Sequence, residues 1–557
     1  MISQRKLDPS AAGTRPPDDP DARELAVVVL AAGNGERMGG GTQKVLREMG
    51  GRALLGHVLD AVEEVRPRHT VVVTGRYREQ VSAYLAKEFG DRAAAWRTAV
   101  QQEQRGYGHA LLAGFEALKG FTGTVVVTAG DAPLLTAPTI RRLIADHEKS
   151  GNAMTLLSGR LPDTAGYSLV LRSEVGEYAS LLPPDRGHRL EDDGRLREVG
   201  AGVYAFDAQI LRAAFRHLLE SGDTAGEYLA TVVDWLTQRS HRIGITVAED
   251  SRDVLGVNDQ RQLSIARRAL RDRINSWWMA AGVDIVDPDS TWIDVRVALE
   301  RDVVVEANTR LYGGTTVHEG ATVGPDTELR DCVVRAGAVV VRSSAVATTV
   351  GEGAVVGPYT SVEGSTVGAG SLVSCSVVRE AEVGDQAEVG PYALVRPDTR
   401  LADRSKVGTF VEIKNSTLGV GAKVPHLSYV GDADIGDGSN IGGLSGFANY
   451  DGRKKYRTVV GRDVRIGGQN GLIAPVTVGD GAYSGARALI SQDVPPGALV
   501  IAEGSIKQRN IPGWVQRNRP GSASALAAAL AQGGIPEAPD DGEAAAQAGA
   551  DATEREG

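Results

Sequence analysis

The 557 residues of this chain are too many for a single hydrophobic core, so we expect two or more domains. The net charge of −10 gives no reason to expect nucleic acid or an acidic membrane surface as a partner. No apolar run approaches the ~18 residues of a membrane-spanning helix. Two cysteines, Cys332 and Cys375, exclude a disulfide framework. With no apolar signal-peptide segment at the start, these features predict a cytoplasmic protein.

The first part of the chain alternates between strand-like and helix-like patterns. Residues 1–24 are rich in proline, aspartate and alanine, and we expect them to be disordered. Short β-branched runs then predict buried parallel strands, and amphipathic segments between them predict helices. The predicted strands are 26–30, 70–74 and 124–134, and the predicted helices are 54–65 and 109–120. This alternation predicts a Rossmann-like, doubly wound α/β domain over residues 25–250.

The second part of the chain has a different period. Residues 251–290 are predicted to be a linker with a long charged helix at 258–282. Aliphatic residues then recur every six positions, as in Leu299, Val305, Leu311, Val317, Val323 and Leu329. A helix has a period of 3.6 and an ordinary strand a period of 2, whereas a period of six fits a three-sided coil of about 18 residues. We therefore predict a left-handed parallel β-helix domain over 291–515, with roughly eleven turns at 295–495, followed by a disordered tail at 516–557.

A glycine-rich loop follows the first predicted strand. The stretch LAAGNGERMGGGTQKVL, residues 30–46, exposes backbone N–H groups and carries Arg37 and Lys44. At the carboxyl edge of a parallel sheet, such a loop is typical of an anion cradle. A triphosphate suits it, although the pattern is neither a P-loop nor GxGxxG.

Several motifs resemble those of one known family. LAAGNGERM with QKVL resembles the signature of sugar-1-phosphate nucleotidyltransferases, QQEQRGYGHA (101–110) their nucleobase loop, and AGDAPLL (129–135) their metal-bearing loop. GEYL (226–229) and GVN (256–258) also match. Downstream lie RPDTRL, VGTFVEIKNSTLG, KVPHLSYVGDADIGDGSNIG and NYDGRKK. Over about residues 25–515 the chain resembles the bifunctional N-acetylglucosamine-1-phosphate uridylyltransferase / glucosamine-1-phosphate acetyltransferase family.

The resemblance implies two reactions and their sites. The C-terminal half would acetylate glucosamine-1-phosphate with acetyl-CoA, and the N-terminal half would join the product to UTP with Mg²⁺, supplying peptidoglycan and other cell-envelope polymers. It assigns the UTP and sugar-nucleotide site to Leu30, Ala31, Ala32, Gly33, Arg37, Lys44, Gln101, Gly106, Tyr107, Gly130, Asp131 and Asn258. Asp131 and Asn258 would hold Mg²⁺, since hard cations prefer oxygen ligands.

The resemblance also assigns the acetyltransferase site. His426 would be the catalytic base, because an imidazole exchanges its proton near neutral pH. Glucosamine-1-phosphate would be bound by Arg396, Lys414, Tyr429 and Asn440. Acetyl-CoA would be bound by Gly443, Asn449, Tyr450, Lys455, Gly468 and Ala486. In this family such sites lie between neighbouring β-helices, which implies a homotrimer.

The chain departs from the family pattern at clustered positions. In the N-terminal half the departures are Gln43 for proline, Tyr107 for threonine, Ala129 for an aromatic residue, Ser168 for glycine, Leu169 for arginine and Gly200 for a sugar-contacting asparagine. A sugar-site glutamate cannot be placed in 176–190. In the C-terminal half Gly443 and Gly468 stand at acetyl-CoA positions, and Glu503 stands where a CoA-binding arginine is expected, with Lys507 and Arg509 nearby.

Three hypotheses follow from these departures. The chain is a working bifunctional enzyme, or an enzyme with one altered half that uses another sugar-1-phosphate or only acetylates, or a non-catalytic scaffold that keeps both folds. The sequence does not separate the first two.

Overall fold

The computed structural model describes residues 23–33, 35, 38–39, 43–164, 166–182, 196–221, 228–502, 512, 514–518, 520–521 and 525. The two predicted tails, 1–24 and 516–557, lie mostly outside these residues. The first strand begins at Arg23, two residues inside the predicted N-terminal tail.

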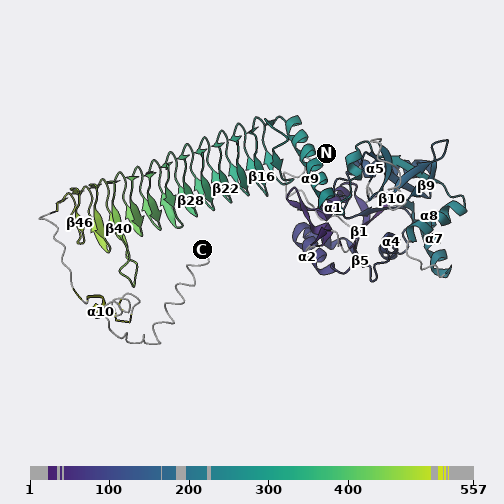
Figure 1. Ribbon diagram of the computed structural model, residues 1–557, viewed down its shortest axis with the longest axis horizontal. Helices are drawn as coiled ribbons and strands as arrows, with labels where there is room; N and C mark the ends of the chain where they lie inside the picture. Colours follow the sequence, from purple (N-terminus) through teal and green to yellow (C-terminus); the bar gives the residue numbers. More distant parts are fainter. Residues whose placement is uncertain are drawn as a thin grey trace. The chain divides into compact units, whose positions relative to one another are not determined.

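A nine-stranded mixed sheet forms the core of the N-terminal half (Figure 1). Its order is β11-β7-β10-β6-β1-β4-β5, with β8 paired to β10 and β9 paired to β8. The strands are β1 (Arg23–Ala31), β4 (Pro67–Thr74), β5 (Arg97–Val100), β6 (Thr124–Ala129), β7 (Met154–Leu161), β8 (Leu169–Arg172), β9 (Tyr178–Leu182), β10 (Arg197–Asp207) and β11 (Ile243–Val247). A separate hairpin joins β2 (Glu48–Met49) to β3 (Arg52–Ala53).

The three predicted strands form the parallel centre of the sheet. β1 pairs in parallel with β4 on one side and β6 on the other. The sheet is not wholly parallel, however, because β10 runs antiparallel to both β6 and β7. The pairing of β10 with β7 shifts register between Gly200 and Tyr204. This glycine-containing bulge interrupts any simple strand period, so the sequence pattern did not predict β10.

Helices cover the sheet and lead out of the first half. They are α1 (Leu54–Glu64), α2 (Arg78–Phe89), α3 (Asp91–Ala94), α4 (Tyr107–Glu116), α5 (Ala137–Ser150), α7 (Ala208–Ser221), α8 (Tyr228–Gln238) and α9 (Gln260–Ala280), with short 3-10 turns η4 (Lys44–Leu46) and η5 (Ser251–Val254). The predicted arm is α9, and its start is fixed by Asp259, whose side chain accepts a hydrogen bond from the Gln262 N–H at 2.8 Å.

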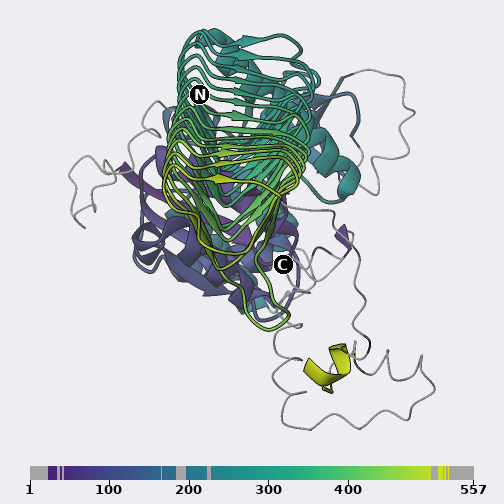
Figure 2. The ribbon, with the colours of Figure 1, turned by 90° about the vertical axis from the view of Figure 1, so that its left-hand side faces the viewer.

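The second half is a parallel β-helix of three ladders, which confirms the predicted fold class (Figure 1). The ladders contain 13, 12 and 11 strands, and Figure 2 views the stack from its carboxyl-terminal end. They run from β12 (Asp284–Ile285) to β47 (Leu499–Val500), from β13 (Trp292–Ile293) to β46 (Leu489–Ile490), and from β14 (Ala298–Leu299) to β44 (Val476–Val478).

The six-residue period corresponds to one buried aliphatic side chain on each face of each coil. Val305, Val323 and Val340 pair in one ladder and are fully buried. The described strands of the coils run from Asp284 to Val500, so the first coil begins within the residues predicted as the linker, 251–290.

After the β-helix, the described residues include one further helix, α10 (Trp514–Asn518), where the Asn518 Nδ2 donates to the Trp514 carbonyl at 2.8 Å. Both cysteines of the chain are free thiols, and Cys332 is buried. Across the described ranges, no helix combines the length and the apolar character that crossing a membrane requires.

Candidate active sites

The first candidate site lies at the carboxyl edge of the central strands. The Gly130 N–H donates to the Leu30 carbonyl at 2.8 Å, and this bond joins the loop after β6 to the end of β1. Gln43 is 1% exposed and its Nε2 donates to the Ala31 carbonyl at 2.7 Å. Around Gly33 nothing lies within 4 Å of the position that a Cβ would occupy. The loop is therefore held from behind while its Gly33 surface is open to a ligand.

Lys44 brings the two predicted metal ligands together. Its Nζ forms an ion pair with Asp131 and donates to Asn258 Oδ1 at 3.0 Å, although these partners are 87 and 214 residues away in sequence. The Val257 N–H donates to the Asp131 carbonyl at 3.0 Å and fixes the two loops to each other. An ammonium thus lies between the carboxylate and amide oxygens, which shows that this pair accepts a cation. Two such oxygens fit Mg²⁺, which usually takes its other ligands from water and phosphate.

The arm helix supports this metal loop. Arg273 of α9 donates to the Leu134 carbonyl at 2.6 Å and forms an ion pair with Asp253, which is 2% exposed. Leu134 belongs to the loop that carries Asp131, and η5 with Asp253 precedes Asn258. Sequence reasoning missed this contact because α9 resembled a simple solvent-exposed connector.

The predicted nucleobase loop is built around Gln101. Its side chain is buried, and its Nε2 donates to the Gly106 carbonyl at 3.1 Å. Gly106 has φ +91°, a left-handed conformation suited to glycine, and it precedes α4. Tyr107 turns towards β10, where its hydroxyl donates to the Gly202 carbonyl at 2.7 Å. Burial raises the pKa of Tyr107 well above its usual value, with Tyr204 and then Asp131 adding to the shift. The Tyr107 hydroxyl is thus engaged within the protein.

Two departures from the family pattern meet on the predicted sugar side. The Gly200 N–H donates to the Ser168 carbonyl at 2.9 Å. A Cβ added at Gly200 would lie 3.4 Å from Leu181 and 3.9 Å from the Ser168 carbonyl, both ordinary contacts. The sugar-side surface therefore lacks a side chain at Gly200, with room for one.

A polar network missed by sequence reasoning lies beside it. Glu198 accepts hydrogen bonds from Ser158 at 2.6 Å and from Arg172 at 2.7 and 2.6 Å. Burial on its own would raise the pKa of Glu198, but the bonds from Arg172 and Ser158 outweigh it and lower that pKa. Glu198 is therefore ionised at neutral pH and ties β8 to β10.

The second candidate site is a cluster of cations on the β-helix. Arg396 follows β31 (Leu394–Val395), and Lys414 ends the next strand of that ladder, β34 (Glu412–Lys414). Arg396 also pairs with Glu412 at 2.9 Å. The close approach of Lys455 lowers the pKa of Lys414, with burial and Arg396 acting in the same direction. Three crowded positive charges favour an anion such as phosphate between them.

Tyr429 and Asn449 adjoin these cations. Tyr429 begins β37 (Tyr429–Gly431), and its hydroxyl lies 3.4 Å from the Asn449 Nδ2. A Cβ at Gly431 would lie 2.4 Å from the Tyr429 hydroxyl, so the absent side chain leaves space for the ring. Asn449 also donates to the buried Asp432.

His426 stands at the start of a strip of small residues. It ends β36 (Lys423–His426), and a Cβ at Gly443 would lie 3.3 Å from the His426 Cβ. A Cβ at Gly468 would lie 3.5 Å from the Gly443 carbonyl, and the Arg487 N–H, next to Ala486, donates to the Gly468 carbonyl at 2.9 Å. The predicted acetyl-CoA residues Gly443, Gly468 and Ala486 thus follow His426 from coil to coil. Gly443 and Gly468 are half-buried, and Ala486 is exposed.

Some predicted residues are not brought together or lie outside the description. Asn440 begins β39 (Asn440–Ile441) and pairs with Lys423, at the other end of β36 from His426. Other positions named in the sequence analysis lie outside the described residues. They are Arg37, residues 183–190 of the segment without a placeable glutamate, Gly226 and Glu227 of GEYL, and Glu503 with Lys507 and Arg509.

Known proteins match both halves. The MobA-like NTP transferase domain family matches residues 27–198. A "Bifunctional protein GlmU" from Streptomyces coelicolor is 46% identical over 91% of this chain and 97% of its own length. Proteins of the same name from Thermobifida fusca and Corynebacterium aurimucosum are 46% and 44% identical over 92% of this chain and 98% of their own. The match extends across the α/β domain, the arm and the β-helix. The chain belongs to the GlmU family of bifunctional proteins.

Proposed function

We propose that this chain catalyses two steps of UDP-N-acetylglucosamine synthesis with the residues described above. It is a uridylyltransferase and an acetyltransferase: it acetylates glucosamine-1-phosphate with acetyl-CoA and then joins the product to UTP, releasing pyrophosphate. The observation that carries this conclusion is a family match covering both halves of the chain. Product analysis with UTP, Mg²⁺ and a panel of sugar-1-phosphates, and separately with acetyl-CoA and glucosamine-1-phosphate, tests each activity.

The uridylyl site works by positioning and charge. The sugar phosphate must attack the α-phosphorus of UTP in line with the departing pyrophosphate, so little covalent help is needed. Leu30–Gly33 and Gly130 would hold the nucleotide, and Gln101 and Gly106 would bind the base. Mg²⁺, held by Asp131 and Asn258, would supply charge neutralisation at the phosphates. Lys44 would then turn from those two oxygens towards the phosphates, with Arg37 assigned the same role from the sequence.

The acetyl site needs a base and an anchor for phosphate. Arg396, Lys414 and Lys455 would hold the 1-phosphate of the sugar, since they form the cation cluster. Tyr429 and Asn440 would orient the sugar. His426 would take a proton from the amine, which then attacks the thioester carbon of acetyl-CoA and releases the CoA thiol. Acetyl-CoA would lie along Gly443, Gly468 and Ala486, beside Asn449 and Tyr450.

The hydrogen bond between Ser168 and Gly200 places two departures from the family pattern together on the predicted sugar side. This observation favours a second candidate function, a uridylyltransferase with relaxed sugar selectivity. Each lost polar contact costs on the order of 1 kcal/mol, so two or three raise the KM for N-acetylglucosamine-1-phosphate roughly 30- to 150-fold. The candidate predicts comparable turnover of other sugar-1-phosphates in the same panel.

Restoring a side chain at Gly200 should tighten sugar binding. Gly200→Asn meets only ordinary contacts at Leu181 and Ser168, so the fold tolerates it. We expect the KM for N-acetylglucosamine-1-phosphate to fall roughly five- to tenfold, the value of one hydrogen bond, with the KM for UTP unchanged. Ala179→Asn is the control, because it adds the same amide at an exposed position of the nearby strand β9. An unchanged sugar KM in Gly200→Asn would contradict this assignment.

An exposed apolar ridge on the β-helix supports a homotrimer. Tyr359, Tyr392, Phe410, Leu427 and Leu444 lie at one corner of the stack and are each at least 51% exposed, with Cys375 at the same corner of the coil between Tyr359 and Tyr392. A ridge of this extent is typical of a protein interface. Leu427 and Leu444 directly follow His426 and Gly443, so a partner packed on the ridge would also border the acetyl site.

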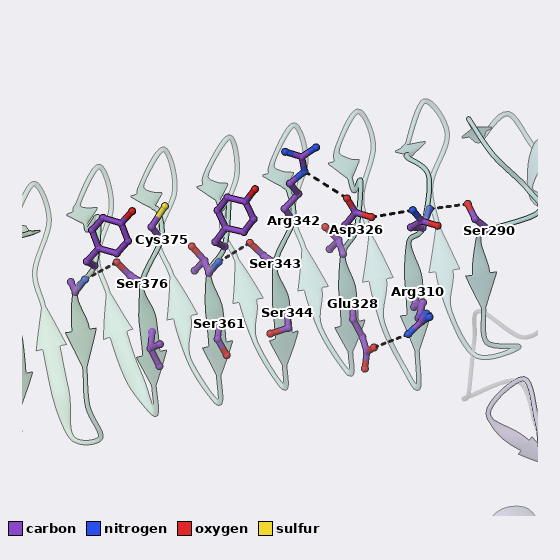
Figure 3. Close-up of a pocket in the computed structure, with 17 residues that line it drawn as sticks. Ser290, Arg310, Asp326, Glu328, Arg342, Ser343, Ser344, Ser361, Cys375 and Ser376 are labelled. Carbon is purple, nitrogen blue, oxygen red and sulfur yellow. Dashed lines mark hydrogen bonds and ion pairs between the residues drawn. The ribbon is translucent and has the colours of Figure 1, made fainter. Parts of the chain in front are cut away.

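A pocket of about 800 Å³ continues the same corner towards the first coils (Figure 3). It is lined mainly by small and polar side chains, among them Ser344, Ser361 and Ser376, and by none of the predicted site residues. Figure 3 shows the Arg310–Glu328 and Arg342–Asp326 pairs at its end. Small side chains beside an aromatic ridge would let a second β-helix pack closely. Light scattering in solution is therefore expected to give the mass of three chains, and a monomer would contradict the proposal.

We also place the enzyme in the cytoplasm, with small-molecule substrates and neither nucleic acid nor membrane as a partner. The acidic net charge of −10 supports this proposal, as do substrates that are phosphorylated or CoA-linked metabolites.

A further inference from the structure

We propose that Asp432 is a positioning residue of acetyl transfer, which acts by holding the hairpin that carries Tyr450 and Lys455. The inference rests on the proposed acetyltransferase function of this site. Asp432 directly follows β37 and is 6% exposed. Its Oδ1 accepts a hydrogen bond from Asn415 Nδ2 at 2.6 Å, and its Oδ2 accepts one from Asn449 Nδ2. Both carboxylate oxygens are thus occupied within the protein.

Asp432 holds both ends of the hairpin. Asn449, at its start, is bound through its side chain, and the Thr458 N–H, at its end, donates to the Asp432 carbonyl at 3.1 Å. The backbone of Asp432 has φ +52°, a left-handed conformation that aspartate tolerates better than most residues. One corner residue therefore fixes the place where the chain leaves the coil and the place where it returns.

The hairpin is internally ordered, so its base determines where its side chains lie. Tyr450 and Lys455 form an antiparallel bridge, and the Tyr456 N–H donates to the Asn449 carbonyl at 2.8 Å. At the tip, Asp451 accepts hydrogen bonds from the Arg453 and Lys454 N–H groups, both at 2.7 Å. A rigid hairpin that tilts at its base carries Tyr450 and Lys455 away together.

Charge gives Asp432 a second role in the same place. Lys414, Lys455 and Arg396 repel one another, and Asp432 is the negative group that favours the charged form of Lys414. Asp432 therefore stabilises the cation cluster while leaving its outer side free for phosphate.

The first test replaces Asp432 with its isostere. In Asp432→Asn only one side-chain oxygen remains to accept from the two amide donors, Asn415 and Asn449, so one of the two hydrogen bonds is lost or must reverse. The negative charge that favours the charged form of Lys414 is lost as well. We expect the KM for glucosamine-1-phosphate, which Lys455 would hold, and the KM for acetyl-CoA, beside Tyr450, each to rise roughly tenfold with a smaller change in kcat, and uridylyl transfer to stay unchanged. Asp437→Asn is the matched control, because Asp437 accepts from the Val420 N–H at 2.7 Å at another corner, away from the hairpin. Parent-like KM values in Asp432→Asn would overturn the proposal.

A second readout needs no activity. Arg453, Lys454 and Lys455 are exposed at the tip, so trypsin reports opening of the hairpin in the native trimer or monomer alike. Asp432→Asn should be cleaved there roughly tenfold faster than the parent or Asp437→Asn. If Asp432→Asn is cleaved faster but the parent protein itself shows no acetyl transfer, the anchoring is supported and the proposed acetyltransferase function is refuted. An unchanged cleavage rate would overturn the anchoring itself.

A double variant distinguishes lost anchoring from general misfolding. In Asp432→Asn/Asn449→Asp the introduced amide oxygen can still accept from Asn415, and its nitrogen can donate to the introduced carboxylate. Both hydrogen bonds and the net charge are kept with the roles exchanged. We expect trypsin resistance to return to within about twofold of the parent, a recovery that the pairwise contact predicts. Cleavage as fast as in Asp432→Asn alone would overturn the pairing.

Discussion

Replacing Asp131 with alanine is expected to lower uridylyl transfer by several orders of magnitude. Asp131 supplies the only charge among the two oxygens that would hold Mg²⁺, and in the structure it already binds the Lys44 ammonium together with Asn258. A phosphoryl-group transition state depends on neutralised charge, so loss of the metal position is costly. Pyrophosphate release from UTP and N-acetylglucosamine-1-phosphate, measured as a function of Mg²⁺ concentration, gives the effect.

Two comparisons make that result specific. Acetyl transfer should keep its parent rate in Asp131→Ala, because the acetyl site is built from the β-helix. Asp146→Ala serves as the matched control, since Asp146 lies on α5 and accepts a hydrogen bond from Thr246 at 2.9 Å. Its uridylyl rate should equal that of the parent. Full turnover of Asp131→Ala at limiting Mg²⁺ would show that the metal lies elsewhere.

The coils of the β-helix were predictable because their signal is repeated. Each coil needs one buried aliphatic residue per face, so the six-residue pattern recurs in coil after coil, as at Val305, Val323 and Val340. The ends of the solenoid were less predictable, since Asp284 and Val500 pair as strands without a repeat beyond them. In the sheet, β10 was not predicted, because its bulge at Gly200 breaks the alternation of apolar and polar residues on which strand prediction depends.

The candidate sites divide in the same way. Lys44, Asp131 and Asn258 were predicted from three separate motifs, and the parallel strand ends bring them together. Asp432 was missed because it is one of several acidic residues at coil corners, such as Asp437 and Asp463, and only the fold of the chain shows which one reaches Asn449. Arg273 was missed for a related reason: its partner Asp253 is close in space but carries no motif. Residues that act through other residues leave little trace in a single sequence.

The His426→Ala variant is expected to lose acetyl transfer by roughly 10²–10⁴-fold, the usual contribution of a positioned general base. The amine of glucosamine-1-phosphate is mostly protonated near neutral pH, and its lone pair must be free to attack the thioester. His426 is exposed at the head of the small-residue strip, close enough to Gly443 that a Cβ there would lie 3.3 Å from its own. Among the described residues, no other histidine belongs to the predicted acetyl site, so no second imidazole is placed there to remove the proton in His426→Ala.

The kind of kinetic loss separates this role from a structural one. If His426 removes the proton, the chemical step slows in His426→Ala, whereas a merely loosened site would weaken the binding of both substrates. The loss should appear in kcat rather than in the KM for acetyl-CoA, because the small residues that follow His426 are untouched. Uridylyl transfer should continue at the parent rate, and a parallel fall would indicate misfolding. Acetyl transfer at the parent rate would mean that another group, from this chain or from a neighbouring copy, takes the proton.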